Sequence, residues 1–178
     1  MKPRGYILAF LLFGLLTTAS CDTTADEFVP TVTADQVTDR ATLKTFVQEA
    51  AKGYLEGLKT QSPEQVEQMF REDGGYWRKG DIYIWIASRE GVILFHAANK
   101  SLEGQNLYEY VDLDGVKYMQ ELIKAADEGG GYVEYLFDNP LVDGDEKSGS
   151  PKVGYTELFT VPYLNNGQPS VIGSGIYP

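Results

Sequence analysis

The hydrophobic pattern of this chain changes period near residue 81, and this change constrains the fold more than any other feature. Before that point apolar residues recur every three or four positions, which is the spacing of an amphipathic helix. These positions are Leu43, Phe46, Val47, Ala50, Tyr54 and Leu58. From Asp81 onward apolar residues alternate with others, as they do along strands. The sequence therefore predicts a long helix packed on a sheet that later strands form.

Two capping boxes mark the helix starts. Thr33 with Gln36 precedes the long helix, and Ser62 with Gln65 precedes a short one. In such a box a hydroxyl and an amide satisfy backbone N–H groups of the first helical turn. Pro63 follows the second cap, where its missing N–H costs nothing. We expect the long helix to begin near residue 34 and the short helix to end near residue 73.

The order of the strands and their connections defines the class of fold. The strands predicted by alternation cover 81–87, 92–97, 132–137, 152–163 and 170–177. A short turn joins the first two strands, and Asn166-Gly167 permits the positive φ angles of a tight hairpin between the last two. The crossover consists of a long connection, 98–116, and a helix, 116–127. We therefore predict an α+β domain with a five-stranded antiparallel sheet, the N-terminal helix on one face and the loop–helix crossover on the other.

The first 20 residues have the pattern of an export signal. Lys2 and Arg4 precede an apolar run, 6–16, which is too short for a resident membrane helix of about 20 residues. Small residues then lead directly to Cys21, the only cysteine in the chain. This arrangement resembles a bacterial lipoprotein box, in which the signal is removed and the cysteine is acylated, although Thr18 stands where leucine is usual. The alternative is a free thiol beside an ordinary cleavage site.

An acylated Cys21 leaves the exported domain without a disulfide, so its apolar core must suffice. The composition, 43% hydrophobic and 12% aromatic, is ample for that core. We expect a signal peptide at 1–20, a tether at 21–33 and one domain at 34–178. The formal net charge of −11 has no basic cluster to offset it, which argues against nucleic acid as a partner.

Several short segments, in a fixed order, carry a resemblance to a known family. They are 82–87, 90–96, 102–107, 112–118, 129–135, 139–140, 151–155 and 171–177. Together they resemble a single Cache domain, a PAS-like extracytoplasmic module that senses ligands. Such domains usually continue into a transmembrane helix and a cytoplasmic signalling region, whereas this sequence stops at Pro178. The resemblance therefore implies ligand recognition and a separate partner for signal transmission.

The candidate ligand-binding residues come partly from this resemblance. Tyr83 and Trp85 share one face of the first strand, so they face a pocket if Ile82, Ile84 and Ile86 of the opposite face pack on the long helix. The alternative is that both are ordinary core aromatics. His96, the only histidine, falls where the family often lines its cavity, and it suits a carboxylate partner or a charge switch near neutral pH. A satisfied buried histidine is its alternative.

Three further residues stand where the resemblance implies groups that face an anionic ligand. They are Lys117, Lys152 and Tyr155. A buried ammonium needs an opposite charge, and a bound carboxylate would supply it. Each lysine is otherwise an exposed, solvated side chain.

No catalytic, cofactor or metal motif appears in the sequence. The acidic stretches 112–115 and 143–146 lack the spacing of an EF-hand loop, so we interpret them as turns. We therefore expect no enzyme activity, no cofactor and no metal.

The hypothesis is a lipid-anchored sensor that faces the periplasm or cell exterior. It binds a small organic metabolite, such as a carboxylate, and reports to a membrane histidine kinase or chemoreceptor. The alternative is a structural or interaction lipoprotein of the same fold without a ligand.

Overall fold

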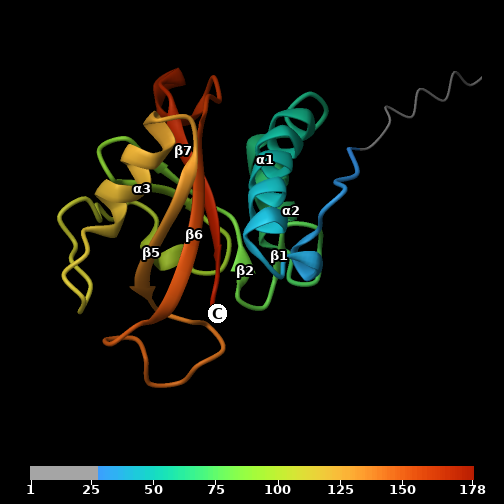
Figure 1. Ribbon diagram of the computed structural model, residues 1–178. Helices are drawn as coiled ribbons and strands as arrows, with labels where there is room; N and C mark the ends of the chain where they lie inside the picture. Colours follow the sequence, from blue (N-terminus) through green and yellow to red (C-terminus); the bar gives the residue numbers. More distant parts are fainter. Residues whose placement is uncertain (1–27) are drawn as a thin grey trace, which may run out of the picture.

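The structure, a computed structural model, describes residues 28–178 (Figure 1). The predicted signal peptide and Cys21 lie outside this range. The domain has three layers, with helices α1 (Arg40–Gly57) and α2 (Pro63–Arg71) on one face of a sheet and helix α3 (Tyr118–Asp127) on the other. The predicted α+β class, the antiparallel sheet and the placement of the helices on opposite faces are confirmed.

The long helix begins later than its first capping box predicted. The box of Thr33 and Gln36 is present, but it starts only one 3-10 turn, η1 (Ala34–Gln36), which ends in extended backbone at Val37. Helix α1 begins after Asp39, whose carboxylate accepts a hydrogen bond from the N–H of Thr42 at 2.8 Å. The predicted start near residue 34 was therefore wrong, because two caps follow each other here. The cap at Ser62 and Pro63 at the start of α2 are confirmed.

The main sheet has the order β4-β3-β7-β6-β5, with every neighbouring pair antiparallel. Its strands are β3 (Trp85–Ser88), β4 (Ile93–His96), β5 (Gly131–Phe137), β6 (Ser150–Phe159) and β7 (Ser170–Ile176). The strand predicted at 81–87 is split, because β2 (Ile82–Tyr83) pairs with β1 (Arg78–Lys79) in a separate two-stranded sheet. The hairpin of β3 and β4 forms as expected, with an irregularity after Ile86.

The turn between β6 and β7 is wider than predicted. Asn165 and Asn166 have φ angles of 50° and 54°, so the positive φ values are present. They belong to a 3-10 turn, η3 (Leu164–Gly167), within a connection that begins after β6 ends at Phe159. The two-residue hairpin expected from Asn166-Gly167 was therefore wrong.

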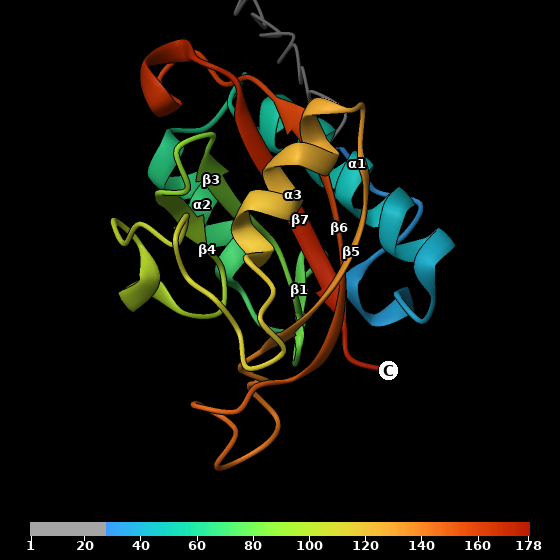
Figure 2. The ribbon, with the colours of Figure 1, turned by 60° about the vertical axis from the view of Figure 1, so that its left-hand side comes forward.

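The connection 98–116 covers one edge of the sheet. After the 3-10 turn η2 (Lys100–Leu102) the chain runs back beside β4. The N–H of Ile93 donates to the carbonyl of Gln105 at 2.9 Å, and the N–H of Gly104 donates to the carbonyl of Ile93 at 2.8 Å. These bonds satisfy backbone groups that an edge strand would otherwise expose. The connection is therefore held to the sheet before it reaches α3 (Figure 2).

The sheet face toward α1 and α2 is closely packed. Ile84, Ile86 and Ile172 of this face are fully buried. Aromatic rings extend the contact, because Tyr54 of α1 meets Phe70 of α2 edge to face, with ring centroids 5.2 Å apart. Apolar burial of this extent is the main source of stability in a small domain without disulfides.

Candidate functional site

The sheet face toward α3 differs because glycines alternate along β7. A Cβ atom at Gly173 would lie 2.3 Å from the ring of Trp85, and one at Gly175 would lie 2.6 Å from Cε of Lys152. Real Cβ atoms do not make such contacts, so each glycine provides the space that a large side chain occupies. The two glycines thus open this face of the sheet to Trp85 and Lys152.

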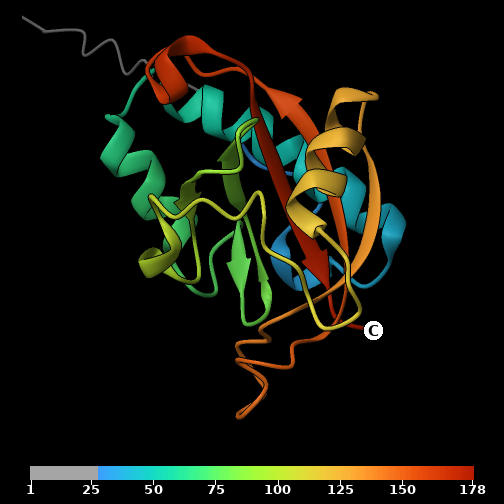
Figure 3. The ribbon, with the colours of Figure 1, turned by 90° about the vertical axis from the view of Figure 1, so that its left-hand side faces the viewer.

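A cavity of about 400 Å³ lies between this face, the connection 98–116 and the loop 138–149. Its volume falls in the range of small-molecule sites. The strands contribute Tyr83, His96 and Phe137 to its wall, and Tyr118 comes from the first turn of α3. In Figure 3 the connection crosses the front of the domain, and the loop 138–149, in orange, extends below it. The predicted pocket beneath the long connection is therefore present.

A second, smaller void of about 20 Å³ lies deeper in the domain. It shares Tyr83, His96, Tyr118 and Phe137 with the larger cavity, and Lys152 is part of its own lining. A space of this size holds about one water molecule, or one oxygen atom of a ligand. Through these shared residues the inner void adjoins the larger cavity on one side and Lys152 on the other.

Lys152 is the least ordinary group in the site. Its side chain is buried, and its Nζ donates to the hydroxyls of Tyr83 at 2.8 Å and Tyr177 at 3.1 Å. The same Nζ lies 4.3 Å from the ring centroid of Tyr83 and 5.2 Å from that of Phe137, which are favourable cation–π distances. Within residues 28–178 no ion pair joins Lys152 to a carboxylate.

The surroundings of Lys152 change its titration. Burial lowers the pKa of its ammonium from 10.5 to about 7, and the charges of Asp81 and Asp138 oppose part of that shift. Burial disfavours the charged form of any base, and a nearby anion favours it. Lys152 is therefore a buried base whose protonated form a bound anion would stabilise.

His96 faces the cavity as a neutral hydrogen-bond donor. Its Nδ1 accepts a hydrogen bond from the N–H of Asn99 at 2.9 Å, so Nε2 carries the proton. Burial, followed by the charge of Lys152, lowers the pKa of His96 to about 3. Among the described residues Nε2 has no hydrogen-bond partner, whereas His96 lines both the cavity and the inner void. The charge switch near neutral pH that the sequence allowed is therefore not expected here.

The main chain of His96 is held by hydrogen bonds to two charged side chains. Its N–H donates to Oε1 of Glu103 at 2.9 Å, and Nη1 of Arg71 donates to its carbonyl at 2.8 Å. Arg71 and Glu103 form an ion pair of 2.5 Å. Three elements, α2, β4 and the connection 98–116, therefore fix the imidazole at the wall of the cavity.

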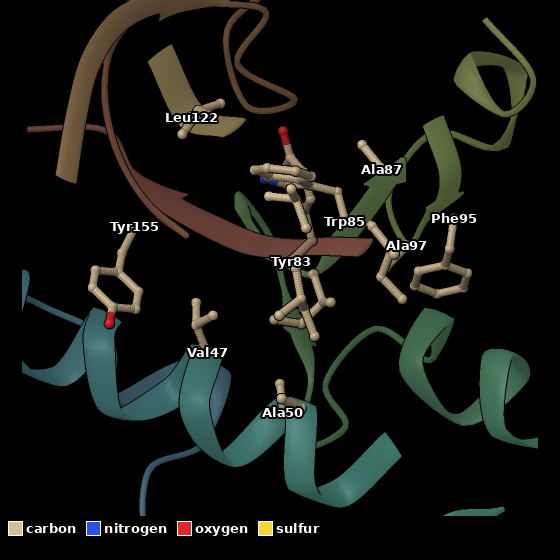
Figure 4. Close-up of a cluster of buried hydrophobic side chains, with 14 of the residues drawn as sticks. Val47, Ala50, Tyr83, Trp85, Ala87, Phe95, Ala97, Leu122 and Tyr155 are labelled. Carbon is tan, nitrogen blue, oxygen red and sulfur yellow. The ribbon is translucent and has the colours of Figure 1, made fainter. Parts of the chain in front are cut away.

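The structure brings four of the predicted site residues together. Tyr83, Trp85, His96 and Lys152 all line the inner void, and Tyr83 and His96 also line the larger cavity. The ring of Tyr83 lies 4.8 Å from that of His96. Trp85 points to the α3 side of β7, toward Leu122 (Figure 4). The prediction that Tyr83 and Trp85 face away from the long helix agrees with this geometry.

The other two predicted residues lie elsewhere. Tyr155 points to the α1 side of the sheet (Figure 4), where its ring lies 5.0 Å from that of Tyr132. Residues three apart on a strand face opposite sides, so Lys152 and Tyr155 do not share a site. Lys117 is exposed at the start of α3 and forms an ion pair of 2.6 Å with Glu109. Neither side chain lines the cavity or the inner void.

Several residues of the site escaped the sequence reasoning. Tyr118 stacks on Tyr135 with ring centroids 5.0 Å apart, and Phe137 meets the ring of Tyr118 edge to face. Tyr177 donates from its hydroxyl to the carbonyl of Asp138 at 2.6 Å, which fixes the oxygen that receives Lys152. The strand register would have revealed one of these residues, because Tyr135 pairs directly with Lys152 across β5 and β6.

The acidic stretches act as turns. Oδ1 of Asp112 accepts from the N–H groups of Asp114 and Val116, and Oδ2 accepts from that of Leu136 at 2.8 Å. Asp145 accepts from the hydroxyl of Ser150 at 2.6 Å. Among the described residues no cluster of three or more potential ligands could hold a metal ion.

The family is established by comparison with known proteins. The family model described as the Cache domain matches residues 45–177. This match covers most of the chain, so the protein belongs to the Cache domain family, whose members are extracytoplasmic sensor domains. Within residues 28–178 no helix has the length and apolarity needed to cross a bilayer.

Solved structures of chemotaxis proteins resemble this chain. One is a methyl-accepting chemotaxis protein from Vibrio parahaemolyticus, with 25% identity over 77% of this chain and 86% of its own, and a TM-score of 0.60. A second is the periplasmic sensor domain of a chemotaxis protein, with 26% identity, coverage of 77% and 93%, and a TM-score of 0.56.

A third structure extends the likeness in fold. It is a Cache chemosensory domain whose structure was described for carboxylic acid recognition, with 24% identity, coverage of 77% and 91%, and a TM-score of 0.57. The fold of this chain is thus that of a Cache domain.

Proposed function

We propose that this protein is a sensory domain that binds a small organic carboxylate in the cavity next to His96 and Lys152. The supporting observation is the buried ammonium of Lys152, which lies beside an inner void and has only tyrosine hydroxyls as hydrogen-bond partners. An ammonium with three protons uses two of them on these hydroxyls. A carboxylate oxygen in the void would take the third.

His96 and Tyr83 support the same ligand class. The free Nε2 proton of His96 is a neutral donor, and a carboxylate accepts from neutral and charged donors alike. Aromatic walls favour an organic ligand over inorganic anions such as sulfate or phosphate. The third solved structure, which was described for carboxylic acid recognition, shares the fold of this chain.

The alternative role, a structural or interaction lipoprotein of this fold without a ligand, requires a filled interior. The inner void between Tyr83, Trp85, His96 and Lys152 is small, about 20 Å³. The adjacent cavity of about 400 Å³ nevertheless offers a ligand direct contact with Tyr83 and His96. This volume favours the sensory role.

Calorimetric titration of the purified protein with single organic acids tests this proposal. We expect saturable binding by at least one monocarboxylate and binding at least tenfold weaker in Lys152→Met. Lys117→Met is the matched control, because Lys117 is exposed and lies outside the cavity. If no acid binds, or if both variants weaken binding equally, Lys152 is not the anion-binding group.

We further propose that Cys21 carries a lipid that anchors the domain to a bacterial membrane. The short apolar run before this single cysteine supports this proposal. We propose a membrane kinase or chemoreceptor as the partner that carries the signal inward. Metabolic labelling with an alkyne fatty acid should mark the wild type and leave Cys21→Ser unlabelled. Equal labelling of both proteins would refute the anchor.

A further inference from the structure

The shape of the cavity carries information about the ligand beyond its carboxylate. A volume of about 400 Å³ equals roughly a dozen water molecules, at about 30 Å³ each. A two-carbon acid would occupy only a small part of it. A ligand that fills the space must therefore have a substantial body beyond its charged head.

Polar partners for that head lie at the inner end of the cavity. His96 and Tyr83 line both the cavity and the inner void, and Lys152 lies behind them. Both rings are buried, with exposed fractions of 4% and 2%. The hydrogen-bonding groups that suit an anion are therefore gathered in the dry interior, where such bonds are strongest.

The mouth of the cavity is apolar on its exposed side. Tyr110, Val111 and Leu113 line it from the connection 98–116, and their side chains are 53%, 45% and 73% exposed. Pro140 lines it from the opposite loop, where the next residue, Leu141, is 66% exposed. Exposed apolar residues that gather around one opening mark a binding surface more often than scattered ones do.

The charges at the mouth exclude a second anionic group. Asp112, Asp138 and Glu146 line the cavity, and Lys147 is the one cation among its lining residues. Both oxygens of Asp112 already accept backbone hydrogen bonds. Burial and the neighbouring Asp145 and Glu146 raise the pKa of Asp138, which reflects the same crowding of negative charge. A second carboxylate on the ligand would meet these groups.

From this polarity we infer that the ligand is an amphipathic monocarboxylate, with its anionic head at His96 and Lys152 and an uncharged apolar tail against Val111, Leu113 and Pro140. This inference rests on the proposed function, since it assigns the tail of the same ligand. Burial of the tail covers the apolar side chains at the mouth.

A chain-length series tests the inference. The purified protein is titrated with the straight-chain acids from acetate to octanoate at constant pH and salt. Each added methylene that enters the apolar mouth is expected to tighten binding about fourfold until the tail outgrows the cavity. Adipate, which adds a second carboxylate to a six-carbon chain, is expected to bind at least tenfold more weakly than hexanoate.

Two variants locate the tail. Leu113→Ser should lower the ratio of hexanoate to acetate affinity about fivefold, because it removes an apolar contact at the mouth. Leu55→Ser is the matched control on α1, where Leu55 is exposed and lies outside the cavity lining, and it should leave that ratio unchanged. An equal effect of both changes would overturn the placement of the tail.

The remaining outcomes separate the inference from the proposed function. If all acids bind with equal affinity whatever their chain length, the inferred tail contact is overturned, and the proposed carboxylate site is unaffected. Tighter binding of 6-aminohexanoate than of hexanoate overturns it too, because the acidic rim would then bind the ammonium at the end of the tail. If no acid binds, the carboxylate site itself fails, and the tail fails with it.

Discussion

The two faces of the sheet use the same strands for opposite purposes. Toward α1 the side chains of Ile84, Ile86 and Ile172 are fully buried in an apolar layer. Toward α3 the same strands carry two glycines, a buried lysine and a histidine around a cavity. Cavities and buried polar groups both destabilise a fold. The packing on the α1 side must therefore offset the cost of the site on the α3 side.

The largest expected effect separates a packed aromatic residue from one at the cavity. Phe70→Ala removes a fully buried ring on the α1 side that stacks on Trp77 at 4.8 Å, and it should lower the free energy of unfolding by about 3–5 kcal/mol. Phe137→Ala, at the cavity wall, should cost about 1–2 kcal/mol, because its surroundings are already partly empty. Urea denaturation measures both, and equal losses would break the contrast between the faces.

The next effect is a gain of stability on the cavity side. Lys152→Met replaces a buried ammonium by an apolar side chain of similar length, and it should stabilise the ligand-free protein by about 1–3 kcal/mol. Tyr177 keeps its bond to the carbonyl of Asp138 in this variant. Urea denaturation at pH 7 without ligand measures the gain. A loss of stability would mean that the lysine holds the two tyrosines in place.

The pH dependence follows from the lowered pKa of Lys152. Its folded pKa is about 7 and its ordinary value is 10.5, so between these values the unfolded chain binds more protons. The free energy of unfolding should therefore rise from pH 7 to pH 9, by up to about 1.4 kcal/mol per pH unit, relative to Lys152→Met. Carboxylate affinity should fall over the same range, since binding then requires uptake of a proton. Parallel stability profiles of the two proteins would contradict this assignment.

The smallest effect compares one hydroxyl on each face. Tyr83→Phe removes the oxygen that accepts from Lys152, and it should weaken carboxylate binding about threefold to tenfold. Tyr155→Phe removes a hydroxyl on the α1 side and should leave binding unchanged. Calorimetric titration of both variants with the same acid measures the difference. A stronger effect of Tyr155→Phe would place the ligand on the α1 side of the sheet and contradict the proposed site.

The sequence predicted the architecture well because period and capping are local signals. The split of the first strand at Ile84 escaped it, since alternation continues across the break while the pairing partner changes from β1 to β7. The predicted helix start near Thr33 was wrong because a capping box specifies one turn and not the length of the helix. Pairing and length depend on distant segments.

The candidate site was predictable in part, and one error, the inclusion of Tyr155, was avoidable. Tyr83 and Trp85 were grouped by period two, and the same rule separates Lys152 from Tyr155. The position of Lys117 depended on whether the turn before α3 points inward, which no local pattern specifies. Tyr118 and Tyr177 enter the site through the crossover and the register of β7, so only the assembled sheet reveals them.

The bonds between β4 and the segment 104–107 have a consequence for how a ligand arrives. Prising that segment away would leave the N–H of Ile93 and the carbonyl of Gly91 without their partners at Gln105 and Leu107, a substantial energetic penalty. The opposite wall, 138–149, belongs to no strand and is held by fewer bonds to the rest of the domain, which include that of Asp145 to Ser150 and that of Asp138 to Tyr177. We therefore expect a ligand to enter and leave past the loop 138–149, while the segment 104–107 stays bound to the sheet edge.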